Sequence, residues 1–123
     1  HLGSLTPTRD MNFVSNTVDG FVMAAQSAAM VGRTVNLGSG REISIGDLAA
    51  LIARLTGIDF EVEREDSRKR PEKSEVNRLL ADHSLATKLM GWTPRVSLEE
   101  GLEKTIAWIR DNLDRYRPNE YTV

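Results

Sequence analysis

Four arginines stand outside the helical patterns of this 123-residue chain, and their side chains suit the binding of a phosphate group. They are Arg9, Arg41, Arg70 and Arg78, each in a stretch with loop or strand-edge character. A planar guanidinium presents paired N–H donors that match two phosphate oxygens. Two arginines that converge from separate loops would form an anion clamp, whereas a single one is usually a solvated surface charge. The sequence leaves open which of them converge.

The sequence offers little support for a metal-binding site or for a catalytic serine or cysteine. His1 and His83 are far apart, and neither has a second ligand at helical spacing. We interpret His83, at the start of a predicted helix, as a surface residue. There is no cysteine, no Gly-x-Ser-x-Gly elbow and no histidine placed to serve a serine as base. We therefore expect neither a metal ligand nor a catalytic residue in this chain.

The segment NLGSG at residues 36–40 carries two glycines after an apolar step. A dinucleotide-binding loop requires G-x-G-x-x-G opening directly into a helix. Here Ile43 stands where the third glycine belongs, and the strand-like ISI precedes the helix. We interpret the segment as a tight turn that permits close backbone approach, and we expect no cofactor-binding residue in it.

Periodicity predicts four helices that position these loops. The first covers residues 16–30, with Asn16 as N-cap and apolar residues at helical spacing. The second covers residues 44–56, with Ser44 and Asp47 at capping-box spacing. A short helix over residues 83–90 is capped by Asp82, and a last one begins after Ser97. The apolar positions of the first helix are Val18, Phe21, Val22, Ala25 and Ala29.

Short strands and one long loop complete the predicted pattern. Residues 34–40 read as a strand that runs into the glycine turn, residues 60–63 alternate like a half-buried strand, and residues 79–80 form a further short strand. The densely charged stretch from residue 61 to 78 reads as an exposed loop. Helices that alternate with short strands predict an α/β or α+β-like fold in a single domain over residues 1–123.

Composition narrows the functional classes. Hydrophobic residues make up 40% of the chain and charged residues 28%, which is ordinary for a globular protein. The net charge of −2 argues against a nucleic-acid surface. No apolar run approaches the roughly 20 residues of a membrane span, and no secretory signal is present, so we expect a cytoplasmic protein. The opening HLGSLTP reads as the interior of a longer protein.

Three segments in this order resemble a known family. They are RDMNFV at residues 9–14, NLGSG at residues 36–40, and RPEKSEVNRLLADHSLATKLMGWTP at residues 70–94. The chain resembles the C-terminal portion of extended short-chain dehydrogenases/reductases, the NAD-dependent epimerase/dehydratase family. Within it, the R-P-x-x-S-E-V run is most similar to nucleotide-sugar 4,6-dehydratases. The resemblance covers most of the chain and implies the substrate-binding part of an extended Rossmann-type enzyme.

The resemblance assigns roles to particular residues. It implies that Arg9 and Arg70 reach the diphosphate of a nucleotide sugar and that Glu75 meets a ribose hydroxyl. Asp10 and Asn36 would position the loops around them. Asn16 replaces the aspartate of the usual V-x-D step and would still cap the helix. Lys73 stands where many epimerases have an aspartate, which weakens a simple epimerase assignment.

The resemblance also implies what lies outside these residues. The NAD-binding Rossmann half and its Tyr-x-x-x-Lys pair have no counterpart here, so we expect NAD in the parent enzyme, no cofactor in this chain and no turnover by it alone. The parent would oxidise the sugar at C4, eliminate water across C5–C6 and return hydride to C6. A 4-epimerase parent and a non-catalytic binding module stay open. The face left uncovered is expected to make the fragment marginal or to drive self-association.

Overall fold

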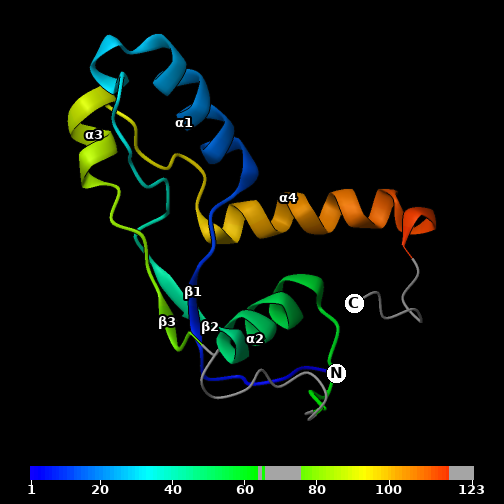
Figure 1. The fold of residues 1–123 in the computed structure, drawn as a ribbon. Helices are drawn as coiled ribbons and strands as arrows, with labels where there is room; N and C mark the ends of the chain where they lie inside the picture. Colours follow the sequence, from blue (N-terminus) through cyan, green and yellow to red (C-terminus); the bar gives the residue numbers. More distant parts are fainter. Residues whose placement is uncertain (64, 66–75, 117–123) are drawn as a thin grey trace.

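The computed structural model describes residues 1–63, 65 and 76–116. They form the α/β fold that the sequence predicts, with four α-helices and a small three-stranded sheet (Figure 1). One helix lies beside the sheet, and the others lie beyond one end of it. The chain therefore places its loops around one short central strand.

That central strand is β1 (Thr8–Asp10), which carries Arg9. β2 (Glu42–Ser44) pairs with it antiparallel, and β3 (Arg78–Leu79) pairs with it parallel, in the order β2-β1-β3. The third strand begins one residue before the predicted strand over residues 79–80. Segments from the beginning, middle and later part of the chain thus meet at β1.

Two predicted strands are wrong. Residues 34–40 and 60–63 form no strand among the described residues. Near the second, Leu2 donates its amide to the carbonyl of Glu63 at 2.9 Å, which is a single bridge rather than a ladder. An alternating pattern specifies which side chains share a face, but a strand also needs a neighbouring strand to receive its hydrogen bonds.

The caps of α2 (Ile45–Thr56) and α4 (Leu98–Asp111) confirm the predicted boundaries. The Ser44 hydroxyl accepts from the Asp47 amide at 3.0 Å, and the Ser97 hydroxyl accepts from the Glu100 amide at 3.2 Å. Gly57 ends α2 in the left-handed region at φ 67°, which glycine adopts without a Cβ penalty. Local capping chemistry suffices to fix both helices.

The start of the first helix differs from the prediction. α1 (Val14–Gln26) begins two residues earlier with Phe13 at the N-cap position, and a 3₁₀ turn, η1 (Ala28–Met30), follows it. Asn16 is therefore not a cap: it lies inside the helix and is only 1% exposed. The predicted apolar stripe, by contrast, is exposed, while Asn16 and Gly20 are the residues that α1 buries.

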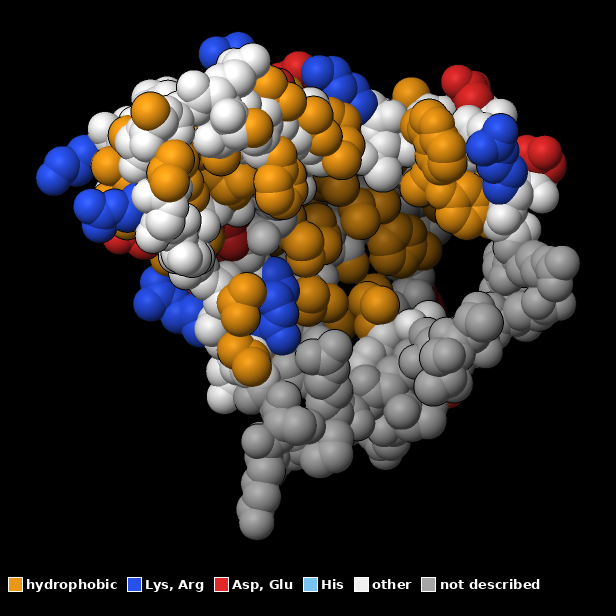
Figure 2. All heavy atoms as spheres, turned by 45° about the horizontal axis from the view of Figure 1, so that its top comes forward, with side chains coloured by type: hydrophobic (Ala, Val, Ile, Leu, Met, Phe, Trp, Pro, Cys, Tyr) orange, Lys and Arg blue, Asp and Glu red, His pale blue; other side chains and the backbone are white. Residues whose placement is uncertain are grey.

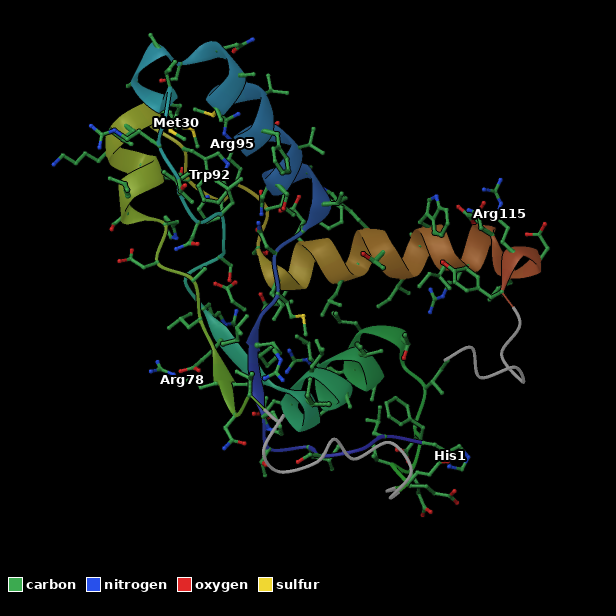
Figure 3. All side chains as sticks on the ribbon, in the orientation of Figure 1. His1, Met30, Arg78, Trp92, Arg95 and Arg115 are labelled. Carbon is green, nitrogen blue, oxygen red and sulfur yellow. The ribbon has the colours of Figure 1, made fainter. Side chains whose placement is uncertain are left out.

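The core is small and lies in two places. Trp92 is buried between α1 and α3 (Ser84–Met90), as Figure 3 shows, and Ala86 is buried on α3, whereas Ala49 and Leu51 are buried on α2. Asp82 accepts from the Ser84 amide at 2.9 Å at the start of α3, although His83 occupies the N-cap position. Gly91 ends α3 at φ 70°, and the chain reaches Trp92 one residue later.

Candidate functional site

Arg9 lies on the central strand, where two other segments converge. Its Nη1 donates to the carbonyl of Thr8 and to the carbonyl of Val76, both at 2.7 Å. The second bond crosses from β1 to the residues that lead into β3. The Arg9 guanidinium is therefore held at the carbonyl of Val76, which is the first described residue after residues 66–75.

Arg70 and Glu75, the other predicted ligand residues, lie outside the described residues. In the sequence, Glu75 directly precedes Val76, whose carbonyl accepts from Arg9.

Asp10 joins three separate segments through one carboxylate. Oδ1 accepts from the Ser39 amide at 2.8 Å and from the Ser39 hydroxyl at 2.6 Å. Oδ2 accepts from the Gly40 amide at 3.0 Å and from the Ala81 amide at 3.3 Å. The carboxylate thus ties β1 to the glycine turn and to the chain that follows β3.

These bonds set the charge state of Asp10. Burial raises the pKa of its carboxyl, but the combined hydrogen bonds from Ser39, Gly40 and Ala81 outweigh burial and hold the pKa below its ordinary value of 3.8. The residue is therefore a carboxylate at neutral pH. Its position in this network suits it to hold the backbone in place, because its oxygens are already occupied by donors.

The glycine turn does not fit the phosphates of a dinucleotide. Such a cradle needs free backbone amides, and the amides of Ser39 and Gly40 both donate to Asp10. A Cβ at Gly38 would meet Ala81 and would lie 2.6 Å from Oδ2 of Asp10. Glycine is required there because β1 and the chain after β3 pass too close for a side chain.

Two of the four arginines considered as clamp residues are engaged in ion pairs. Arg41 Nη1 contacts both carboxylate oxygens of Glu99, at 2.9 and 3.1 Å. Arg78 Nε contacts both oxygens of Glu42, at 3.0 and 2.9 Å, and one of these oxygens also accepts from the Thr8 hydroxyl. Arg41 and Arg78 are therefore each engaged with a carboxylate.

The two asparagines of interest have opposite surroundings. Asn36 is exposed, and its side chain makes no hydrogen bond within the described part of the chain. Asn16, by contrast, accepts at Oδ1 from the amides of Arg95 and Val96, both at 3.0 Å. Its Nδ2 donates to the Val96 carbonyl at 2.9 Å and to Asn12 at 3.0 Å.

Asn16 therefore anchors the loop between α3 and α4, a role that sequence reasoning missed. The indole Nε1 of Trp92 donates to the Asn16 carbonyl at 3.0 Å, so the same residue also orients the largest buried side chain. Figure 3 shows Trp92 and Arg95 beside α1. The sequence signal for this role is a single asparagine among the apolar residues of a helix. Local capping rules assign such an asparagine to the start of the helix, and so they missed its buried position.

His83 is not the surface residue that the sequence suggests. Its ring packs edge-on against Trp92 with centroids 5.7 Å apart, and it lies 3.0 Å from the position of a Cβ at Gly40. Its Nδ1 is buried and has no hydrogen-bond partner among the residues that the structure describes. His83 thus packs the glycine turn against the Trp92 cluster.

Two apolar grooves flank the link between β1 and α1. One, of about 130 Å³, is lined by residues that include Met11, Phe13 and Leu102. The other, of about 470 Å³, runs between α1 and α4 and is lined by Phe13, Val14, Lys104, Thr105 and Trp108. Figure 2 shows hydrophobic side chains around this hollow. Within the described residues no cluster of three metal-ligating side chains occurs, and no helix is long and apolar enough to cross a membrane.

Comparison with known proteins gives consistent matches. The GDP-mannose 4,6 dehydratase family matches residues 1–105. UDP-glucuronic acid decarboxylase 1 of Xenopus tropicalis is 38% identical over 123 residues, covering 97% of this chain and 27% of the relative. Further relatives are named as UDP-glucose 4-epimerase, UDP-glucuronate 4-epimerase and GDP-L-fucose synthase.

Solved structures share the fold. An epimerase from Methanothermobacter thermautotrophicus is 32% identical with a TM-score of 0.83, covering 93% of this chain and 33% of its own. The UDP-glucose 4-epimerase of Thermotoga maritima, solved with UDP-glucose, is 30% identical with a TM-score of 0.79, covering 92% of this chain and 35% of its own. Other neighbours were solved with NAD⁺, or with NAD⁺ and UDP. The chain spans about a third of the length of the proteins it matches.

Proposed function

The chain belongs to the NAD-dependent epimerase/dehydratase family of extended short-chain dehydrogenases/reductases, and from this premise we propose that it is the substrate-binding portion of a nucleotide-sugar-modifying enzyme. Its task is to hold the diphosphate of an NDP-sugar, with Arg9 and Arg70 as the anchors and Glu75 at a ribose hydroxyl. NAD supplies hydride transfer in the complete enzyme. This chain contributes binding and orientation.

The contact between Arg9 and the Val76 carbonyl carries this proposal. It fixes a guanidinium of the central strand at Val76, the residue that follows Glu75 in the sequence. A diphosphate between Arg9 and Arg70 would meet positive charge from two segments that are distant in sequence. Solved neighbours with UDP-glucose or UDP support the same ligand class.

Asp10 and the glycine turn stabilise the strand that carries Arg9. Asp10 is adjacent to Arg9 on β1, so the two side chains project from opposite faces of the sheet. The four hydrogen bonds to Asp10 hold the strand to residues 39, 40 and 81. These bonds hold the backbone of β1 in place, and the contacts of Arg9 with Thr8 and Val76 restrain its side chain, which together reduce the entropy lost when a ligand binds.

Within this class we propose a 4,6-dehydratase. The match to the GDP-mannose 4,6 dehydratase family over residues 1–105 and the R-P-x-x-S-E-V run support it. A 4-epimerase is the second candidate, because several relatives carry that name. Anchoring of the diphosphate is common to both, so the described residues serve either reaction.

A nucleotide panel tests the proposed function. The protein is titrated calorimetrically with UDP, GDP, dTDP, the corresponding nucleoside monophosphates and NAD. We expect at least one nucleoside diphosphate to bind about tenfold or more tightly than its monophosphate, since the added phosphate gains contacts with charged donors. Equal affinity for diphosphate and monophosphate, or no affinity for any of these nucleotides, would overturn the proposal.

A further inference from the structure

One side of α4 carries a row of exposed side chains in which the charges follow a definite order. The row consists of Glu100, Lys104, Ala107, Trp108, Asp111 and Arg115. Residues three and four apart share one face of an α-helix, so these side chains form a single stripe along it. From the first turn of α4 to the 3₁₀ turn η4 (Leu113–Arg115) that follows, the stripe reads acidic, basic, apolar, acidic, basic. We call it the charged stripe of α4.

The charges in the second half of the stripe have no partner of their own. Lys104 donates to Glu100 at 2.7 Å, so the first two charges are already paired within the helix. Within the residues that the structure describes, the side chains of Asp111 and Arg115 make no hydrogen bond and no ion pair. Figure 3 shows Arg115 at the far end of α4, away from the sheet. These two side chains are therefore available to an external partner.

The centre of the charged stripe is apolar. Trp108 is 50% exposed, and its indole packs edge-on against Tyr116 with ring centroids 6.2 Å apart, which orients it on the helix surface. Ala107 beside it is also exposed and leaves room for a bulky side chain opposite. Figure 2 shows hydrophobic side chains flanked by acidic and basic ones over this end of α4. Aromatic residues are enriched in the core of protein interfaces, with polar residues around them.

The charged stripe is complementary to itself when the helix direction is reversed. In an antiparallel pair of α4 helices, Trp108 of each copy can lie opposite Ala107 of the other, so that a large side chain meets a small one. This register places every charge of the stripe opposite a charge of the other sign. The facing pairs are Lys104 with Asp111 and Glu100 with Arg115. A two-fold axis between the helices forms each of these contacts twice.

We propose that two copies of this protein associate along the charged stripe of α4, antiparallel about a two-fold axis next to Trp108. A second copy supplies the required charges in the required order. An apolar surface would instead leave Asp111 and Arg115 desolvated without a partner, which is costly. The pairing uses one helix from each copy, so we expect a dissociation constant on the order of 10 µM. This inference goes beyond the proposed function and does not depend on it.

Charge reversal separates contact between copies from effects within one copy. Asp111→Lys places two lysines opposite each other, and Lys104→Asp places two carboxylates opposite each other. Sedimentation over a concentration series should show that each variant self-associates about tenfold or more weakly than the unsubstituted protein. An equimolar mixture of the two variants restores opposite charges, so its affinity should lie within about threefold of the unsubstituted protein. The control Asp59→Lys, exposed outside the stripe, should change the affinity by less than about twofold.

Ala107→Glu tests the apolar centre without removing a charge pair. Two added carboxylates would meet near the axis, so self-association should weaken about tenfold or more while the unfolding midpoint stays unchanged. Three results would overturn the inference. They are a protein that stays monomeric well above the expected dissociation constant, self-association that none of the stripe substitutions weakens, and a mixture of Asp111→Lys and Lys104→Asp that associates no better than either variant alone.

Discussion

The amide and the hydroxyl of Ser39 both donate to one carboxylate oxygen of Asp10, at 2.8 and 2.6 Å. This pair links the central strand to the glycine turn 29 residues later in the chain. Because the Gly40 and Ala81 amides occupy the other oxygen, the same carboxylate also fixes the chain after β3. The turn is thus shaped by Asp10 rather than by a bound phosphate.

Replacement of Asp10 by asparagine should destabilise the protein by about 1–2 kcal/mol at pH 7, because charge-assisted hydrogen bonds are lost from a partly solvated site. The folded-state pKa of Asp10 lies below its ordinary value of 3.8. Its stabilising contribution is therefore fully present above pH 3.8 and is lost as the pH falls through the lower folded-state pKa. Urea unfolding of Asp10→Asn should show a weaker acid dependence than the unsubstituted protein.

Asp59→Asn is the control for that measurement, since Asp59 is exposed and lies outside the network. If both variants show the same stability and the same acid dependence, the network does not hold the turn.

Asn16→Ala should destabilise the protein by about 2–4 kcal/mol, because two backbone amides in the loop between α3 and α4 lose their acceptor. Asn36→Ala is the matched control: its side chain is exposed and makes no hydrogen bond in the described chain, so the change should stay within about 0.5 kcal/mol. Chemical unfolding of the two variants separates them, and equal losses would refute the anchoring role of Asn16.

Gly38→Ala should destabilise the protein by about 1–3 kcal/mol, because the new methyl group would press on Ala81 and on Asp10. Gly46→Ala, near the start of α2, provides a glycine with ordinary space, as its nearest neighbour would be 3.5 Å away. Helix propensity predicts that this control is neutral or up to about 1 kcal/mol more stable. Thermal unfolding that ranks the two variants the other way would contradict the close approach at Gly38.

The hydrogen bond from Arg78 is the main cause that lowers the pKa of Glu42, and the Thr8 hydroxyl adds to it. In Arg78→Gln, the carboxyl resonance of Glu42 should titrate closer to its ordinary value of 4.5. Because the folded-state pKa is depressed, any stabilisation from this pair is present above pH 4.5 and is lost as the pH falls through the lower value. An unchanged titration midpoint would show that the pair is not formed in solution.

Sequence reasoning succeeded where local chemistry decides the structure. The caps at Ser44 and Ser97 follow from contacts within four residues, and the structure confirms both. The family resemblance likewise followed from short motifs in a fixed order, and the match over residues 1–105 confirms it.

Sequence reasoning was wrong where the deciding contact is distant. Asn16 is bonded to residues about 80 positions away, and these outweigh its preference for a helix start. The pattern over residues 34–40 predicts a strand, but pairing depends on a neighbouring strand that the described residues do not provide. His83 shares this cause, since Trp92 and the glycine turn enclose it through the fold rather than through adjacent residues.

The affinity of Arg9 variants for the nucleotide sugar tests the central claim most directly. Arg33→Ala is the control, because Arg33 is exposed after η1 and takes part in none of the described contacts of Arg9 or Asp10. Calorimetric titration should show that Arg9→Ala binds the diphosphate sugar about 10- to 100-fold more weakly, whereas Arg33→Ala binds it like the unsubstituted protein. Equal affinities for the nucleotide sugar in Arg9→Ala and in the unsubstituted protein would contradict the assignment of Arg9 as a diphosphate anchor.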